Sequence, residues 1–145
     1  MKAVRIALAS ALFTFASGVA IADEGIAWHT DYQAAAEEAK ASGKLLFINF
    51  SAQWCGPCQA MKRDTYPNLA VKKQMERFVP VYIDVDNNTE LANKFGGNAR
   101  AYGGNGIPAM IVVDNDGNEL YRHHGYRSAA QLTAALGKIK TGDKQ

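Results

Sequence analysis

Residues 45–58 read LLFINFSAQWCGPC and form the most informative stretch of the chain. The first part, Leu45–Ser51, is almost continuously apolar, which is typical of a strand covered on both faces in a parallel or mixed sheet. The strand leads directly into Trp54 and two cysteines, Cys55 and Cys58, which a Gly-Pro dipeptide separates. The sequence therefore predicts a cysteine pair at one end of a buried sheet.

A helix is expected from Gly56 to about residue 63. Pro57 fits its first turn, because the N–H that proline lacks would have been unpaired there. Cys55 then lies at the N-terminus of the helix, where unpaired N–H groups and the helix dipole favour a thiolate. Cys58 lies one turn further along, on the same face. This spacing predicts that an exposed Cys55 attacks a partner disulfide and that Cys58 resolves the mixed disulfide.

The rest of the sequence alternates helical and strand patterns. Three strands separated by helices argue for parallel crossovers, and an Asp-Gly turn adds an antiparallel edge, so an α/β sandwich with a mixed sheet is predicted. Local signals conflict over residues 96–106, which hold five glycines in eleven residues, and no element is assigned there. The other expected elements are helices over 31–42 (begun by a capping box of Thr30 and Gln33), 69–77 and 89–95, strands over 79–85, 109–114 and 119–125, and a last helix begun by Ser128 and Gln131.

The first 22 residues have the pattern of a cleaved export signal. Lys2 and Arg5 give a positive start, an apolar stretch follows, and the tripeptide Ala-Ile-Ala at 20–22 is a small-x-small cleavage site. The apolar run is shorter than the roughly 20 residues that cross a bilayer, which disfavours a retained membrane anchor. A single domain over 23–145 is then expected. Its 14 basic and 14 acidic residues suggest neither nucleic acid nor an anionic membrane as a partner.

The chain holds only two cysteines, three positions apart. Disulfides persist in exported proteins, but a bridge that closes so short a loop contributes little stability, because the entropic effect grows with loop length. A disulfide between these two cysteines would therefore stabilise the fold only slightly, which favours a chemical role for the pair.

The pentapeptide WCGPC at 54–58, after an apolar strand and with Gly-Ile-Pro at 106–108 later in the chain, resembles a thioredoxin. The resemblance runs from the first expected helix to the last and implies a thioredoxin-like three-layer sandwich, with a mixed sheet flanked by helices. Within this superfamily the chain is most similar to exported thiol:disulfide interchange proteins such as the C-terminal periplasmic domain of DsbD. The shared features are a leading helix ending in Ala-x-x-x-Gly-Lys, a helix broken at Thr65-Tyr66-Pro67, and an Asp116-Gly117 hairpin followed by Gly125-Tyr126.

The resemblance also implies an activity, a compartment and partners. The protein would be a periplasmic thiol:disulfide oxidoreductase, acting more as a reductant, with the Cys55–Cys58 dithiol or disulfide as its redox group and no other cofactor or metal. Its partners would be exported proteins with disulfides or dithiols and a membrane thiol reductase. The protein itself would be a monomer, without stable membrane insertion after signal cleavage.

A substrate groove follows from the same resemblance. Trp54, Gly56 and Pro57 complete the motif, and the tryptophan is expected to cover the rim of the site rather than to fill the core. The bond between Ile107 and Pro108 would be a cis peptide that faces the cysteines, pairs with a substrate strand and keeps the sulfurs free of metal. From the sequence alone, the same proline is simply a strand-start residue.

Two features depart from the thioredoxin pattern. Thioredoxins usually carry a buried aspartate six residues before the first cysteine, where it assists proton transfer to and from the second; Asn49 stands there, and asparagine does not titrate. The lysine that often pairs with that aspartate is replaced by Tyr82 or a neighbour. We therefore expect a changed rate and pH profile more than a changed reaction. The glycine-rich stretch before Pro108 is about seven residues longer than in a plain thioredoxin, which fits either a role in shaping the partner groove or a tolerated surface insertion.

Two other functions stay open from the sequence: a copper or zinc carrier, and a redox-inactive interaction module. The Gly-Pro dipeptide between the cysteines disfavours the carrier. His123 and His124 are consecutive on an expected strand, so they point to opposite faces and cannot both ligate one metal. His29 is expected at the surface. The Asp and Asn residues from Asp84 onward lack the glycine and closing glutamate of a calcium loop, so strand-end and cap roles are expected for them.

Overall fold

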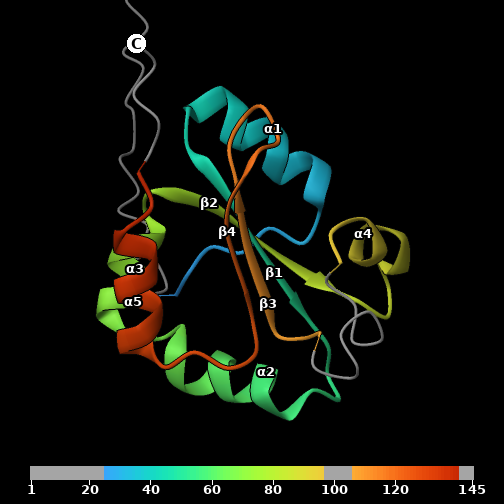
Figure 1. Cartoon of the computed structure of the whole chain (residues 1–145), viewed down its shortest axis with the longest axis vertical. Helices are drawn as coiled ribbons and strands as arrows, with labels where there is room; N and C mark the ends of the chain where they lie inside the picture. Colours follow the sequence, from blue (N-terminus) through green and yellow to red (C-terminus); the bar gives the residue numbers. More distant parts are fainter. Residues whose placement is uncertain (1–24, 97–105, 141–145) are drawn as a thin grey trace, which may run out of the picture.

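A computed structural model describes residues 25–96 and 106–140. Within these ranges helices and strands follow the predicted order (Figure 1). The elements are α1 (Tyr32–Ser42), β1 (Leu45–Ser51), α2 (Gly56–Ala60), the π-helix η1 (Met61–Thr65), α3 (Leu69–Met75), β2 (Phe78–Asp84), α4 (Thr89–Lys94), β3 (Ala109–Val113), β4 (Glu119–His124) and α5 (Ala129–Gly137).

The strands form one sheet in the order β2-β1-β3-β4. β1 and β2 are parallel, whereas β3 is antiparallel to both β1 and β4. Parallel neighbours need a crossover connection, which α2, η1 and α3 provide between β1 and β2. The tight turn between β3 and β4 contains Gly117, whose φ of 85° lies in the left-handed region that glycine adopts readily. The mixed sheet predicted from the sequence is confirmed. The expected parallel crossover into β3 is wrong, because β3 runs antiparallel to β1.

Helices cover both faces of this sheet (Figure 1). Alternate side chains of β1 point to opposite faces. Leu46, Ile48 and Phe50 pack with α1 and α4, and Leu45 and Phe47 pack with η1, α3 and α5. Helix layers on the two faces of one sheet give the three-layer α/β sandwich that the resemblance implies.

The start of α1 differs from the prediction. The sequence predicts a capping box of Thr30 and Gln33, but the N-cap is Asp31, whose Oδ1 accepts a hydrogen bond from Ala34 N at 2.7 Å. Gln33 instead donates to Glu37 one turn later, at 3.3 Å. A carboxylate at the N-cap combines a good acceptor with a negative charge near the positive end of the helix dipole, which favours Asp31 over a threonine.

The helix after the cysteines is also shorter than predicted. α2 ends at Ala60, and the chain continues as η1, in which Tyr66 N donates to Met61 O at 3.0 Å across five residues. Met61, Thr65 and Tyr66 are all buried. Thr65 Oγ1 donates to Arg127 O at 2.7 Å, which ties the π-helix to the loop after β4. A contact between residues this far apart leaves no local pattern, so the sequence does not predict the wider turn.

The final helix begins as predicted, with a reciprocal capping box between Ser128 and Gln131. Within the described ranges, no helix combines the length and the apolar character needed to cross a bilayer. The predicted export signal and residues 97–105 of the glycine-rich stretch lie outside the described residues.

The stability of the fold should depend on the core residues that pack on the two faces of the sheet. We expect Leu132→Ala to lower the free energy of unfolding by about 2–5 kcal/mol, because Leu132 is fully buried under the sheet and its truncation leaves a cavity. Leu69→Ala removes the same atoms from a side chain that is 76% exposed, and should cost less than about 0.5 kcal/mol. Urea unfolding of the oxidised protein measures both, and equal losses would contradict the core described above.

Candidate active site

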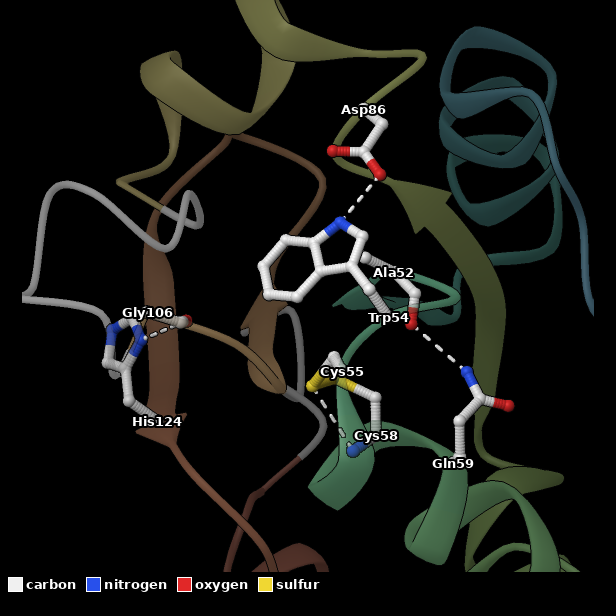
Figure 2. Close-up of a disulfide and its surroundings, with 8 residues drawn as sticks. All are labelled: Ala52, Trp54, Cys55, Cys58, Gln59, Asp86, Gly106 and His124. Atoms are coloured by element: carbon white, nitrogen blue, oxygen red, sulfur yellow. Dashed lines mark hydrogen bonds between the residues drawn. A yellow bond between two sulfur atoms is a disulfide. The ribbon is translucent and has the colours of Figure 1, made fainter.

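Cys55 and Cys58 form a disulfide where β1 turns into α2 (Figure 2). The carbonyl of Ala52, just after the strand, accepts a hydrogen bond from Cys55 N at 3.3 Å and another from Gln59 Nε2 at 3.0 Å. Pro57 occupies the first turn of α2, as predicted. One backbone oxygen therefore holds the first cysteine and the following helix to the end of the central strand.

Cys55 is the N-cap residue of α2. Its Sγ accepts a hydrogen bond from Cys58 N at 3.3 Å (Figure 2). This N–H belongs to the first turn, where a helix leaves its amide hydrogens without backbone partners. A donor in this position stabilises negative charge on the Cys55 sulfur.

Both cysteines are covered in the disulfide form. Each is only 4% exposed, and both belong to the hydrophobic cluster that contains Ile107 and Ala109. The sequence predicts an exposed Cys55, and this is wrong for the oxidised protein. The residues around the start of β3 belong to the same cluster as the sulfurs, and this packing cannot be foreseen from the cysteine motif alone.

Trp54 lies on the rim of the site and not in the core. Its side chain is 61% exposed, and its Nε1 donates to Asp86 Oδ2 at 2.7 Å (Figure 2). Asp86 stands in the turn after β2, where Asp84 Oδ1 accepts from Asp86 N at 2.9 Å. Asp84 thus has the predicted strand-end role. Sequence reasoning misses Asp86 as the anchor of the tryptophan, because 32 residues separate the two side chains.

The peptide bond between Ile107 and Pro108 is cis. Phe50 of β1 pairs with Ala109 of β3, so the proline lies beside the strand end that leads to the cysteines. Pro108 O accepts a hydrogen bond from Gly125 N at 2.7 Å. The proline loop is therefore fixed to the end of β4 and placed next to the disulfide.

The histidines are spread over the molecule. His124 Nδ1 lies 2.9 Å from Gly106 O at the start of the proline loop (Figure 2). His123 lies against Arg127, and burial, with the arginine charge adding to it, lowers the pKa of His123 below its usual value. His29 is partly exposed; its Nε2 lies 2.9 Å from Glu38 Oε2, and its backbone pairs with Val81 of β2. Among the described residues, no three His, Cys, Asp or Glu side chains gather as a metal site.

Asn49 is buried in β1, directly opposite Tyr82 of β2. Tyr82, one of the residues expected in place of the thioredoxin lysine, is thus the neighbour of Asn49 on the adjacent strand. Asn49 is 2% exposed, and its Oδ1 accepts no hydrogen bond from any residue that the structure describes. A buried carbonyl oxygen without a hydrogen-bond donor lowers the stability of a fold by about 1–3 kcal/mol. The presence of Asn49 at this buried position therefore calls for an explanation.

A cavity of about 540 Å³ lies behind the disulfide, between β1, β2 and the segment from η1 to α3. Tyr66 is buried there, and burial raises the pKa of its hydroxyl far above the usual value, so the hydroxyl stays protonated at neutral pH. Sequence reasoning does not find this cavity, although Lys62 follows Cys58 at the four-residue spacing that brings helical side chains together. The polar and titratable side chains of its lining include Asn49, Cys58, Lys62, Tyr66, Lys72 and Tyr82.

A disulfide that joins the N-cap residue to the first turn of a helix, at the end of the central strand of a mixed sheet and beside a cis-proline loop, defines the thiol:disulfide oxidoreductases of thioredoxin architecture. Comparison with known families gives the same class. The family model for the thioredoxin-like domain matches residues 32–140. The chain therefore belongs to the thioredoxin-like family, as the sequence resemblance predicts.

Two curated relatives have names that refer to thiol:disulfide interchange or to thioredoxin. The thiol:disulfide interchange protein DsbD of Tatumella citrea is 26% identical over 103 residues, which cover 70% of this chain and 17% of that protein. The thioredoxin-related protein DsbJ of Chlamydia pneumoniae is 27% identical over 135 residues, which cover 83% of this chain and 37% of that protein. The chain thus spans well under half the length of either curated relative.

A solved structure shows the same similarity. The oxidised C-terminal domain of DsbD from Neisseria meningitidis superposes with a TM-score of 0.60 and 26% sequence identity. The match covers 79% of this chain and 100% of that one. Similarity to the C-terminal domain of DsbD, stated above from motifs alone, is therefore confirmed.

The contact between Trp54 and Asp86 can be tested directly. We expect Asp86→Ala to increase the local motion of the Trp54 indole, because the substitution removes the acceptor of its N–H. Asp86→Asn keeps an oxygen at this place and should resemble the parent. Time-resolved fluorescence anisotropy in a Trp28→Phe background, where Trp54 is the only tryptophan, measures the motion. Unchanged anisotropy in Asp86→Ala would show that the hydrogen bond does not hold the indole.

Proposed function

We propose that the chain is an exported thiol:disulfide oxidoreductase that exchanges a Cys55–Cys58 dithiol or disulfide with partner proteins, more as a reductant than as an oxidant. The observation that carries this proposal is the hydrogen bond from Cys58 N to Cys55 Sγ, at 3.3 Å. It gives Cys55, and not Cys58, a donor that stabilises a thiolate, and only the thiolate is an effective nucleophile. The similarity to the thiol:disulfide interchange protein DsbD supports the same reaction.

The reaction proceeds in two exchanges. The Cys55 thiolate attacks one sulfur of a partner disulfide, forms a mixed disulfide and releases the other partner sulfur as a thiolate. Cys58 then loses its proton and attacks Cys55 Sγ, which restores the internal disulfide and releases the second partner sulfur. Two electrons pass from the dithiol to the partner. The Cα atoms of the two cysteines are only 5.2 Å apart, so the second exchange needs little movement.

Partner proteins dock, in this proposal, over the exposed aromatic side chains beside the disulfide. Trp54 projects from the rim, and Tyr126 is exposed directly after Gly125, the residue that holds Pro108 O. The Gly-Pro dipeptide between the cysteines is exposed as well. An extended partner segment would lie between these groups and pair with the backbone of the Ile107–Pro108 bond.

The proposal also includes export to the periplasm and two kinds of redox partner. The signal-like pattern at 1–22 supports transfer to the periplasm, with residues 23–145 as one domain that contains the matched region 32–140. There, a membrane thiol reductase would supply electrons to the Cys55–Cys58 disulfide, and exported proteins with disulfides would receive them. The folded protein would act as a monomer.

Trapping tests the roles of the two cysteines. In Cys58→Ala the mixed disulfide cannot be resolved, so we expect covalent complexes with exported proteins to accumulate on non-reducing gels. In the matched Cys55→Ala variant we expect few or none, because the remaining thiol lacks the amide donor at the helix start. Preferential trapping by Cys55→Ala would reverse the two roles.

The same cysteines separate the alternative functions. Normal function of a Cys55→Ser, Cys58→Ser double variant would indicate an interaction module without redox activity. Tight stoichiometric metal in the reduced, purified protein would indicate a metal carrier. Either result would overturn the proposed exchange reaction.

Equilibration with glutathione buffers tests the direction of electron flow. A reductant should have a reduction potential closer to the roughly −270 mV of thioredoxin than to the roughly −120 mV of the oxidant DsbA. The ratio of dithiol to disulfide, measured by mass spectrometry after acid quenching and alkylation, gives the value. A potential near that of DsbA would reverse the proposed direction and leave the exchange chemistry in place.

A further inference from the structure

The cavity behind the disulfide gives Cys58 a second way to solvent. Cys58, Asn49 and Tyr66 are buried residues of its lining, while Lys62 belongs to the lining and is exposed. Trp54, which marks the face for partner docking, is not part of this lining. The cavity therefore joins the buried Cys58 to solvent through a lining that includes the exposed residues Gln53 and Lys62.

The charge in this cavity is positive. The titratable side chains that line it with Cys58 are Lys62 and Tyr66 from η1 and the residue after it, Lys72 from α3 and Tyr82 from β2. Among its described lining residues, none is an aspartate or a glutamate. Lys62 stands four residues after Cys58 in the chain, and both residues belong to the lining of the cavity. Burial disfavours a negative charge on the Cys58 sulfur, and the two lysine charges act in the opposite direction.

Asn49 adds an unpaired acceptor to the same cavity. Its Oδ1 has no hydrogen-bond donor among the described residues while Cys58 is in the disulfide. Reduction of the disulfide gives Cys58 a thiol hydrogen, which is a donor. The dithiol form therefore places a donor in the same cavity as the unpaired acceptor. Because asparagine does not titrate, it can orient the thiol but cannot remove its proton.

We propose that Asn49 positions the Cys58 thiol and that the lysine-lined cavity is the route by which its proton leaves to solvent; this rests on the exchange function proposed above. The Cys58 S–H bond breaks, the proton passes to water, and the sulfur electron pair attacks Cys55 Sγ. The bond from Cys55 to the partner sulfur breaks, and the partner leaves as a thiolate that solvent protonates. The partner disulfide is reduced by two electrons, and the dithiol is oxidised. Lys62 and Lys72 stabilise the transient Cys58 thiolate.

The pH dependence of the resolving step tests this route. Reduced protein is mixed rapidly with oxidised glutathione and quenched with acid, and mass spectrometry follows the mixed disulfide and the internal disulfide. For Lys62→Gln we expect the midpoint of the profile to rise by about 0.5–1 pH unit, because a positive charge near the thiolate is lost. Resolution below the midpoint should slow by roughly three- to tenfold. Lys73→Gln, on the exposed part of α3 and outside the cavity lining, should match the wild type.

Asn49→Asp supplies the second arm of the test. A carboxylate at this position should add an ionisation to the profile of the resolving step, which a merely structural role of Asn49 would not do. Lys62 is exposed, so Lys62→Gln keeps the test decisive if the buried Asn49→Asp variant does not fold. Wild-type profiles in both variants would overturn the proposed route. A wild-type protein that forms no mixed disulfide would instead contradict the exchange function itself.

Discussion

All seven residues of β1 are buried, and both edges of the strand are hydrogen-bonded, to β2 on one side and to β3 on the other. A strand held on every side has little freedom to shift, so its last carbonyls occupy fixed positions. Ala52 O, just beyond the strand, collects the N–H groups of both Cys55 and Gln59. The packing of β1 in the core therefore determines where the disulfide lies. The loop that contains the cysteines itself needs little internal stabilisation.

The two faces of the disulfide have different chemistry. The side that we propose to face partners carries an exposed indole and a proline loop. Cys58 lines a cavity that also contains lysine, tyrosine and asparagine side chains. Cys55 and Cys58 thus stand in different surroundings although only two residues separate them. Distinct surroundings are what a two-step exchange requires, because one sulfur must attack another protein and the other must attack its neighbour.

Local patterns in the sequence account for much of the fold. The apolar run Leu45–Ser51 is a strand with the predicted bounds, and the Ser128 capping box begins the last helix. The departures arise where distant residues meet: the π-helix is tied to the loop after β4, and Asp86 reaches the tryptophan from another element. The burial of Cys55 and the cavity behind Cys58 have the same origin. Periodicity reports which face of an element is apolar, but not which side chains from elsewhere will cover it.

The short segment from Gly125 to Arg127 contacts both the proline loop and the π-helix η1. Gly125 N holds Pro108 O, and Arg127 O receives the hydroxyl of Thr65 from the π-helix, each at 2.7 Å. The proline loop and the helix that follows the cysteines are thereby braced against each other. A site braced in this way keeps its shape before any partner arrives, so the entropic cost of complex formation falls on the partner. Flexible, locally unfolded segments around a disulfide would then be engaged more readily than disulfides held within rigid folds.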